Sequence, residues 1–212
     1  GGGYSVNAIF SPDSKLMGGL SLLADMIVVN CLYLLCCIPI FTIGAARVAL
    51  YCVGMCWARR ESAGVKKYIS VFISSIKSTF ALWATVLLCG VFLIADCYLF
   101  LIADIPYESI GVCALVILTV LYLFVASQIF LLASQFDNSF KQTIANAFLI
   151  SFAYPIRSIV HIILLVLPVV VFLFLPKVFV HAGLLWFLSL EVYLDSLIIR
   201  PVYARLQTQK SE

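Results

Sequence analysis

Apolar residues in this chain gather into six long runs that are separated by short polar segments. The runs lie near residues 16–38, 42–58, 80–103, 110–133, 158–176 and 178–199. About 20 residues of helix cross the roughly 30 Å hydrocarbon core of a bilayer, so runs of this length are typical of membrane-spanning helices. The pattern predicts an all-α fold, a polytopic transmembrane helical bundle with about six spans.

The runs occupy so much of the chain that no segment is left for a separate water-soluble domain. We expect a single transmembrane domain over residues 4–212, preceded by Gly1–Gly3, which look like a cloning remnant. Composition agrees, because 64% of the residues are hydrophobic and only 11% are charged. A soluble domain carries about a quarter of charged residues, so this class is excluded.

The second run is the shortest, and its role decides the number of spans. As a helix, residues 42–58 would be about 25 Å long, which is short enough for an interfacial or re-entrant segment. Apart from Arg47, however, the run is apolar on every side, whereas an interfacial helix needs a polar face. This favours six spans over a five-span alternative that leaves residues 42–58 in the cytoplasm.

The basic residues predict the orientation in the membrane. With six spans and the N-terminus inside, eleven of the thirteen Lys and Arg residues are cytoplasmic, and only Arg47 and Lys177 face out. The five-span version also places eleven there, exchanging Arg47 for Lys15. Both versions predict a multi-pass protein of the cell (plasma) membrane with a cytoplasmic C-terminus.

Two segments between the runs predict amphipathic helices on the cytoplasmic surface. In residues 59–80 apolar side chains recur every three to four positions while lysines occupy other faces, which is typical of a basic helix lying on a membrane. Residues 137–151 repeat this pattern more weakly. We expect contacts with a partner or with the membrane surface from Arg59, Arg60, Lys66, Lys67 and Lys77.

Several polar side chains fall at membrane depth, where an ionisable group needs a partner, a water-filled cavity or a function. Helix rise places Asp25, Asn30, Glu191 and Asp195 in the first and last spans, with the three carboxylates in the inner half. They predict a polar cavity that is open to the cytoplasm and suited to a cation, a proton or a polyol; the alternative is structural pairing.

Two further charged residues fall near the outer face. By the same arithmetic Arg47 and Asp96 lie about 8 and 10 Å below it. We expect them to form a structural ion pair.

The sequence has no pattern typical of nucleic-acid binding, disulfide bonding, metal binding or catalysis. The net charge of +3 is scattered, so nucleic acid is not an expected partner. Nearly all of the eight cysteines lie in apolar runs, where free Cys acts as a small hydrophobe, and neither a disulfide framework nor a metal site is expected. His161 and His181 are single and are interpreted as interfacial. No catalytic triad, Gly-rich phosphate loop or HExxH motif occurs, so we expect neither an enzyme nor a cofactor.

Residues 30–46 read NCLYLLCCIPIFTIGAA, preceded by Asp25 and followed by Ala49-Leu50-Tyr51. This segment resembles the opening signature of the YesL family of small bacterial integral membrane proteins, and Phe72 to Trp83 is similar to that family's basic, Phe-rich segment. The resemblance implies a family of unknown activity whose genes often accompany those for carbohydrate-uptake transporters and polysaccharide breakdown in Gram-positive bacteria. It brings no established catalytic residues.

The turn within this segment also has a physical explanation. We expect Pro39 to end one helix, Thr42 to cap the next, and Gly44 to let two helices approach closely.

Two functions remain open at this point. The first is an accessory subunit of a membrane transport complex for carbohydrate uptake, which contacts its partner through the basic segment 59–77. The alternative is a small autonomous solute transporter, which suits the buried carboxylates but would need to act as a homo-oligomer, because such machines commonly have twelve or more spans.

The topology is testable with reporter fusions after Lys15, at Phe41 and after Arg60. Six spans require a cytoplasmic signal at the first point, a change of side by Phe41 and a return by Arg60. An outward signal at Lys15, with no change of side between Phe41 and Arg60, would favour five spans.

Overall fold

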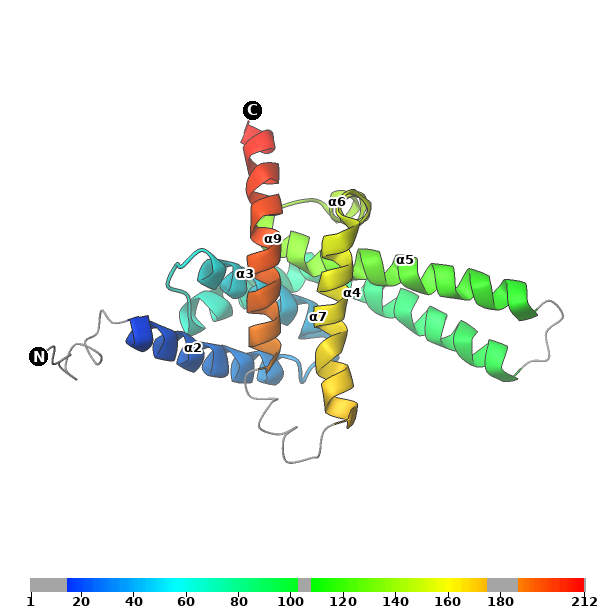
Figure 1. Ribbon diagram of the computed structural model, residues 1–212, viewed down its shortest axis with the longest axis horizontal. Helices are drawn as coiled ribbons and strands as arrows, with labels where there is room; N and C mark the ends of the chain where they lie inside the picture. Colours follow the sequence, from blue (N-terminus) through cyan, green and yellow to red (C-terminus); the bar gives the residue numbers. More distant parts are fainter. Residues whose placement is uncertain (1–14, 103–107, 175–186, 212) are drawn as a thin grey trace, which may run out of the picture.

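The computed structural model describes residues 15–102, 108–174 and 187–211, and every regular element in these ranges is a helix. The elements are α2 (Lys15–Cys36), η1 (Ile40–Thr42), α3 (Ile43–Ala58), α4 (Val65–Ile102), α5 (Glu108–Gln135), α6 (Phe140–Ala153), α7 (Pro155–Phe174) and α9 (Phe187–Ser211), with the labels of Figure 1. The predicted all-α fold is confirmed over these ranges. Lys177, His181 and the start of the predicted span 178–199 lie outside the described residues.

Helix α3 forms the centre of the fold. It contacts α2, α4, α5 and α9, and its residues 44–51 are all buried. Two glycines permit these close contacts. A Cβ atom on Gly54 would lie 2.6 Å from Val192 Cγ1 of α9, and one on Gly44 would lie 2.8 Å from Trp83 Cβ of α4. The close approach expected at Gly44 is therefore confirmed, and the short second run provides the core against which the longer helices pack.

The junction between α2 and α3 lies where Pro39 predicts a break, but the Thr42 hydroxyl forms other hydrogen bonds than the expected cap. Helix α2 ends at Cys36, shortly before Pro39. The Thr42 hydroxyl does not cap α3; it lies 2.6 Å from the carbonyl oxygen of Cys36 and 2.7 Å from that of Pro39. Its backbone is already helical (φ −94°, ψ −7°), whereas a capping side chain normally stands on an extended residue. The hydroxyl therefore stabilises the end of α2.

Helix α4 is a single uninterrupted helix of 38 residues, about 57 Å long. The predicted surface helix 59–80 and the predicted span 80–103 are thus one element that begins at Val65. No proline interrupts the stretch. Four of its Ser and Thr hydroxyls donate to carbonyls three or four residues earlier in the same helix, as Thr79 does to Ser75 at 2.7 Å. The surface of α4 changes from basic to apolar along its length, while the backbone remains one continuous helix.

Helices α6 and α7 meet at a sharp elbow of 107°. Pro155 occupies the first position of α7, where its missing N–H costs nothing, and it prevents α6 from continuing. At its other end α6 begins with Ser139, whose N–H donates to the Gln142 side chain at 3.1 Å. A separate helix therefore exists where the weaker amphipathic pattern predicted one, and it exposes Phe148, Leu149 and Phe152.

Four helical segments in the described ranges are long and apolar enough to cross a membrane: Met17–Cys36, Ile40–Ala58, Val65–Phe100 and Ile110–Gln135. The bent pair α6–α7 raises this to five if it counts as one span. In Figure 1 α4 and α5 run along the long axis of the molecule, whereas α7 and α9 run across it. The helices are therefore not one parallel bundle, and the count of six spans stays a prediction.

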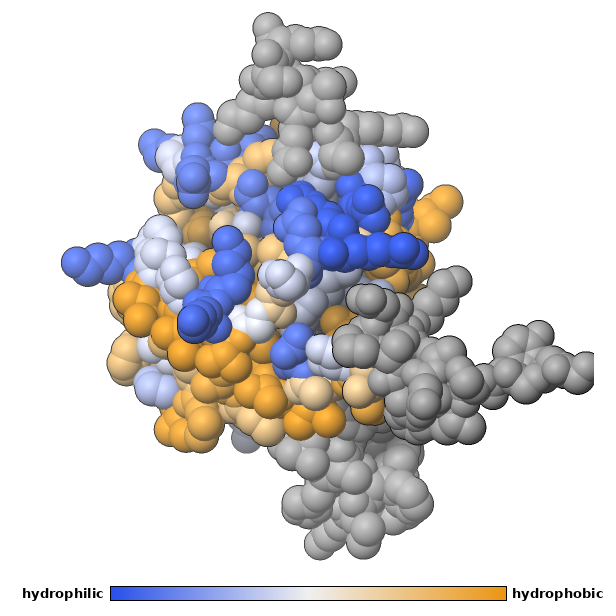
Figure 2. Space-filling view, turned by 90° about the vertical axis from the view of Figure 1, so that its left-hand side faces the viewer, coloured by the Kyte–Doolittle hydropathy of each residue, from blue (hydrophilic) through white to orange (hydrophobic). Residues whose placement is uncertain are grey.

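Polar and apolar side chains are unevenly distributed on the surface. Figure 2 shows one face on which hydrophilic side chains gather in the upper half and hydrophobic ones form a band below them. Large exposed apolar side chains also cover the projecting parts of α4 and α5, among them Leu88, Phe92, Ile94, Ile110 and Ile117. Soluble proteins do not expose apolar patches of this extent, so this distribution is consistent with membrane localisation.

Arg60 has an unusual backbone at the end of α3. Its φ of 61° lies in the left-handed region. The Glu61 N–H bonds to the Cys56 carbonyl and the Arg60 N–H bonds to the Trp57 carbonyl, both at 2.9 Å. These are the two bonds of a Schellman motif, in which the left-handed position is usually glycine.

Replacing Arg60 with Gly should therefore stabilise the protein. A non-glycine residue in this conformation costs about 1 kcal/mol or more, and glycine adopts it freely. Thermal unfolding in detergent should show a higher Tm for Arg60→Gly and no gain for Arg60→Ala, which removes the same charge but keeps a Cβ. Equal gains from both would trace the effect to the charge.

Candidate functional site

A network of five buried polar side chains lies where α3, α7 and α9 meet. Arg47 and Tyr51 come from α3, His161 from α7, and Glu191 and Asp195 from α9. All five are at most 8% exposed. The two residues from α3 and the two from α9 are each four positions apart, so each pair projects from one face of its helix. The face of α3 that carries Arg47 and Tyr51 thus lies opposite the face of α9 that carries Glu191 and Asp195.

The first part of the network is an ion pair between α3 and α9. The Arg47 Nη2 atom lies 2.9 Å from both carboxylate oxygens of Glu191 and 3.0 Å from the Tyr51 hydroxyl oxygen. The Arg47 guanidinium also stands 4.8 Å from the centre of the Tyr51 ring. A buried charge is costly unless it is paired and hydrogen-bonded, and here both conditions hold.

This geometry corrects the expected partner of Arg47. Helix rise along the sequence predicts an ion pair with Asp96, whereas the structure pairs Arg47 with Glu191. The prediction compared depths along parallel spans. In the structure α4 carries Asp96 away from α3 on a projecting hairpin, so an equal depth does not bring the two side chains together (Figure 1).

The second part of the network is a pair between α7 and α9. His161 Nδ1 lies 2.6 Å from Asp195 Oδ2, and both side chains are at most 1% exposed. The two groups are not aligned as a straight hydrogen bond. On its other side His161 Nε2 lies 3.0 Å from the Ser127 carbonyl oxygen and 3.5 Å from the Tyr51 hydroxyl.

The His161 ring is held between α5 and α9. The Ser127 carbonyl oxygen can only accept, so a hydrogen bond between it and Nε2 has the ring nitrogen as donor. The opposite ring nitrogen, Nδ1, then faces the Asp195 carboxyl group.

His161 is the member of the network that the sequence pattern does not reveal. A lone histidine near the end of an apolar run is usually interfacial, whereas this side chain is fully buried. Its partner Asp195 was recognised at membrane depth. The missing step was the contact between α7 and α9, which no local pattern encodes.

The other residues of the predicted polar cavity have separate roles. Asn30 is buried on α2, and its Oδ1 accepts from the Ser189 N–H at 3.1 Å and lies 3.4 Å from the Ser189 hydroxyl, two residues before Glu191. Asn30 thus joins α2 to the start of α9. Asp25 is exposed beside Gly64 in the loop before α4 and does not belong to the network.

The basic residues predicted to contact a partner lie at the end of α3 and along α4. Arg60, Lys66, Lys67 and Lys77 are exposed. Arg59 is half-buried, and its Nη2 atom donates to Gln135 Oε1 at 3.2 Å, which ties α3 to the end of α5. Four of the five side chains are therefore accessible.

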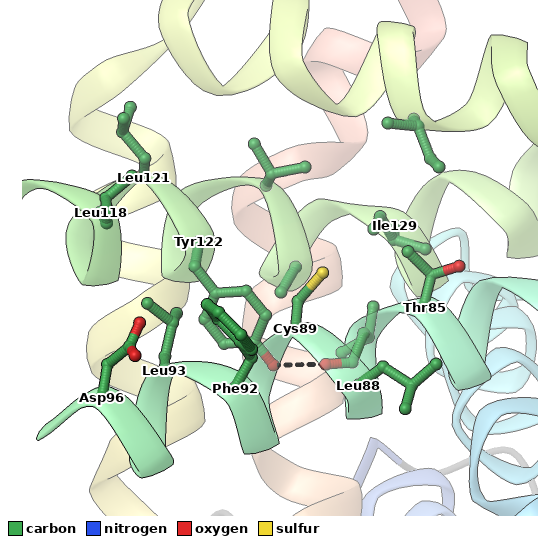
Figure 3. A pocket seen from close by; sticks show the side chains of 14 residues that line it. Thr85, Leu88, Cys89, Phe92, Leu93, Asp96, Leu118, Leu121, Tyr122 and Ile129 are labelled. Atoms are coloured by element: carbon green, nitrogen blue, oxygen red, sulfur yellow. Dashed lines mark hydrogen bonds between the residues drawn. The ribbon is translucent and has the colours of Figure 1, made fainter. Parts of the chain in front are cut away.

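A large apolar groove runs between α4 and α5. Its volume is about 640 Å³, and nearly all of its lining is aliphatic or aromatic. The Tyr122 hydroxyl crosses from α5 and donates to the Val86 carbonyl at 2.9 Å, while Asp96 points from α4 towards α5 (Figure 3). Asp96 is half-buried, and it belongs to neither of the two ion pairs found in the described residues.

In the described ranges no three His, Cys, Asp or Glu side chains are arranged to hold a metal ion. The eight cysteines are free thiols. The polar features of this part of the chain are the buried network of α3, α7 and α9 and the half-buried carboxylate of Asp96.

Comparison with known proteins gives one finding. Residues 26–97 match a family model. It is described as a protein of unknown function, DUF624. The matching segment covers the second half of α2, all of α3 and α4 up to Cys97, and it contains Arg47, Tyr51 and Asp96. No curated protein and no solved structure matches the chain. The α7 and α9 residues of the network lie outside the matching segment.

Breaking the Arg47–Glu191 pair should be costly unless both charges are removed. Arg47→Met and Glu191→Met should each lower the free energy of unfolding by about 3–5 kcal/mol, because each leaves an unpaired buried charge. The double variant should lose much less than the sum of the two. Unfolding of detergent-solubilised protein, followed by circular dichroism, measures all three.

The matched control is Lys77→Met, an exposed charge whose removal should change stability by about 0.5 kcal/mol at most. Strictly additive losses in the Arg47–Glu191 cycle would contradict the pair.

Proposed function

We propose that this chain is a non-enzymatic, multi-pass protein of the bacterial cell membrane that serves as an accessory subunit of a carbohydrate-uptake complex. The observation that carries the proposal is Asp96, a carboxylate without a cationic partner in the described residues, on the apolar groove of a projecting hairpin. The resemblance to the YesL family supports the link to carbohydrate uptake, and the DUF624 match is consistent with that resemblance.

The interior of the protein is suited to a structural role. Each carboxylate of the buried network has a basic partner on another helix, Glu191 with Arg47 and Asp195 with His161. Charges that neutralise each other inside the core are not available to a substrate. Asp96, on the α4–α5 hairpin, is a carboxylate that stays without a basic partner in the described residues.

The hairpin has the properties of a contact surface within a membrane. A carboxylate in hydrocarbon costs several kcal/mol unless it meets a cation or hydrogen-bond donor. The groove beside Asp96 is wide and apolar enough to receive side chains of another transmembrane helix. The partner that fits is an apolar helix with one Lys or Arg at the depth of Asp96, which would neutralise the carboxylate on docking.

The first part of α4 complements this contact. The helix is about 57 Å long, roughly 27 Å more than a bilayer core, so a part of it stands outside the hydrocarbon. The exposed Lys66, Lys67 and Lys77 lie on the first third of α4. They would contact anionic headgroups or an acidic surface of the same partner on the cytoplasmic side.

The proposed topology has six spans and a cytoplasmic C-terminus. It is supported by the excess of basic residues in the segments assigned to the cytoplasm. Four helical segments, or five with the bent pair α6–α7, are long and apolar enough to cross a membrane in the described residues, and α9 would supply the sixth span. Helix α9 is the least apolar of the assigned spans, but its buried carboxylates are paired, which lowers the cost of burying them in the membrane.

The second candidate function is an autonomous solute transporter that acts as a homo-oligomer. The observation that favours it is the His161–Asp195 pair, because buried pairs that hold one proton are common in proton-coupled transport. In this role the network would exchange protons during transport, rather than serve only as a frame.

The Asp96→Asn variant separates the two functions. In mild detergent the native chain should co-purify with a transport protein, and Asp96→Asn should reduce the recovered amount about tenfold, because the amide cannot neutralise a buried cation. Asp25→Asn, an exposed carboxylate on α2, is the matched control and should change nothing.

Exchanging the charges of Asp96 and of the partner's basic residue would identify the two residues in contact. Asp96→Lys should abolish the complex, and replacement of the partner's basic residue with Asp should restore it. Unchanged recovery with Asp96→Asn, or movement of labelled sugar into liposomes by the purified chain alone, would contradict the accessory role; the second result would favour the transporter.

A further inference from the structure

One face of helix α6 packs against α5. Its buried residues, Thr143, Ala147 and Ser151, follow one another at intervals of four positions, so they form a stripe along one side of the helix. The Ser151 hydroxyl oxygen lies 2.8 Å from the Phe124 carbonyl oxygen of α5. This contact fixes the rotation of α6 and thereby decides which side chains face away from the protein.

The side of α6 that faces away from α5 carries a patch of three large apolar side chains, the apolar face of α6. Phe148, Leu149 and Phe152 are 49%, 63% and 49% exposed, and the ring centres of the two phenylalanines are 4.7 Å apart. At 100° per residue, Gln142 and Asn146 lie on a narrow polar strip beside this face. An exposed patch of large apolar side chains is typical of a surface that a membrane or a partner covers.

The direction of α6 indicates which of the two covers it. Helices α6 and α7 meet at 107°, and in Figure 1 α6 is seen end-on, whereas α4, α5, α7 and α9 run across the picture. A membrane normal along any of these four helices is therefore nearly perpendicular to α6. With 14 residues α6 is about 21 Å long, which is too short to cross the hydrocarbon core. The helix thus runs parallel to the membrane surface.

Basic side chains lie at both ends of the apolar face. Lys141 is exposed in the first turn of α6, and Arg157 is half-buried in the first turn of α7, where its guanidinium stands 5.6 Å from the centre of the Tyr154 ring. No acidic residue occurs between Lys141 and Arg157 in the sequence. Long basic side chains lay their stems on apolar surface while their charges reach the phosphate level, where tyrosine is also enriched. The charge of this face is therefore complementary to anionic lipid headgroups.

We propose that α6 is an interfacial helix that docks on a membrane leaflet containing anionic lipids. Its apolar face inserts at the acyl boundary, and its polar strip faces water. Lys141 and Arg157 bind lipid phosphates at the two ends. Because Pro155 starts α7 directly after the elbow, the docked helix also fixes the depth at which α7 enters the membrane. The proposal requires a membrane around the chain, but neither Asp96 nor a transport partner.

The test uses the full chain in nanodiscs of equal amounts of phosphatidylcholine and phosphatidylglycerol, with the photoreactive residue p-benzoylphenylalanine at one position at a time. Positions 148 and 149 should each form at least tenfold more lipid adduct, measured by mass spectrometry, than position 142 on the polar strip. Equal amounts at all three positions would place α6 in hydrocarbon on every side and overturn the proposal. Adducts to a second copy of the chain in place of lipid would overturn it as well.

The kind of lipid in the adducts tests the two basic ends. At position 148, phosphatidylglycerol should be recovered over phosphatidylcholine at least twofold above their ratio in the nanodisc. The preference should disappear in the double variant Lys141→Gln/Arg157→Gln. The matched variant Lys141→Arg/Arg157→Lys keeps both charges and should keep the preference.

An adduct ratio equal to that of the nanodisc lipids in the chain with both basic residues would overturn the docking on anionic lipid. So would a preference that survives the loss of both charges. These measurements do not depend on the recovery of a transport protein, so a failure of this proposal is distinguishable from a failure of the accessory role.

Discussion

The burial of the Arg47 guanidinium is the constraint on which the rest of the core depends. An arginine stays charged under all ordinary conditions, so a buried one must be held by a carboxylate at hydrogen-bonding distance. Glu191 meets this need and thereby fixes α9 against α3 at one rotation and one height. The next turn of each helix then brings Tyr51 and Asp195 level with His161, which adds α7 to the same arrangement. Gly54 allows the close approach that these short contacts require.

This constraint divides the molecule into two regions with different chemistry. In the core, Glu191 is paired with Arg47 and Asp195 lies against His161, so the contacts join three helices. On the α4–α5 hairpin, a carboxylate stands in an apolar groove without a cation among the described residues. The core pairs hold the helices together. The Asp96 carboxylate on the hairpin would be neutralised by a cation from a partner molecule.

The sequence predicts some of this fold and not the rest, for identifiable reasons. Apolar runs predict helices near 16–38, 42–58 and 110–133, because hydrophobic length is a local property. Depth arithmetic recognised Arg47 and Glu191 as groups that need partners but gave Arg47 to Asp96, because it treats all spans as parallel and α4 leaves the core. His161 was missed since a single histidine has no signature until its neighbour on another helix is known. The division of α4 at residue 80 was wrong because a change in surface polarity does not break a backbone that lacks proline.

The continuity of α4 has a mechanical consequence. A helix of 38 residues without a proline behaves as a stiff rod, and its nineteenth residue is Trp83, which packs tightly against Gly44 at the centre of the fold. Its first half is fixed along α3, where Tyr68 is fully buried and its hydroxyl donates to the Ala46 carbonyl at 3.4 Å. The half beyond Trp83 projects from the core with α5 (Figure 1). A force on the hairpin is therefore carried along one stiff backbone into the α3 core, with no hinge between them to absorb it.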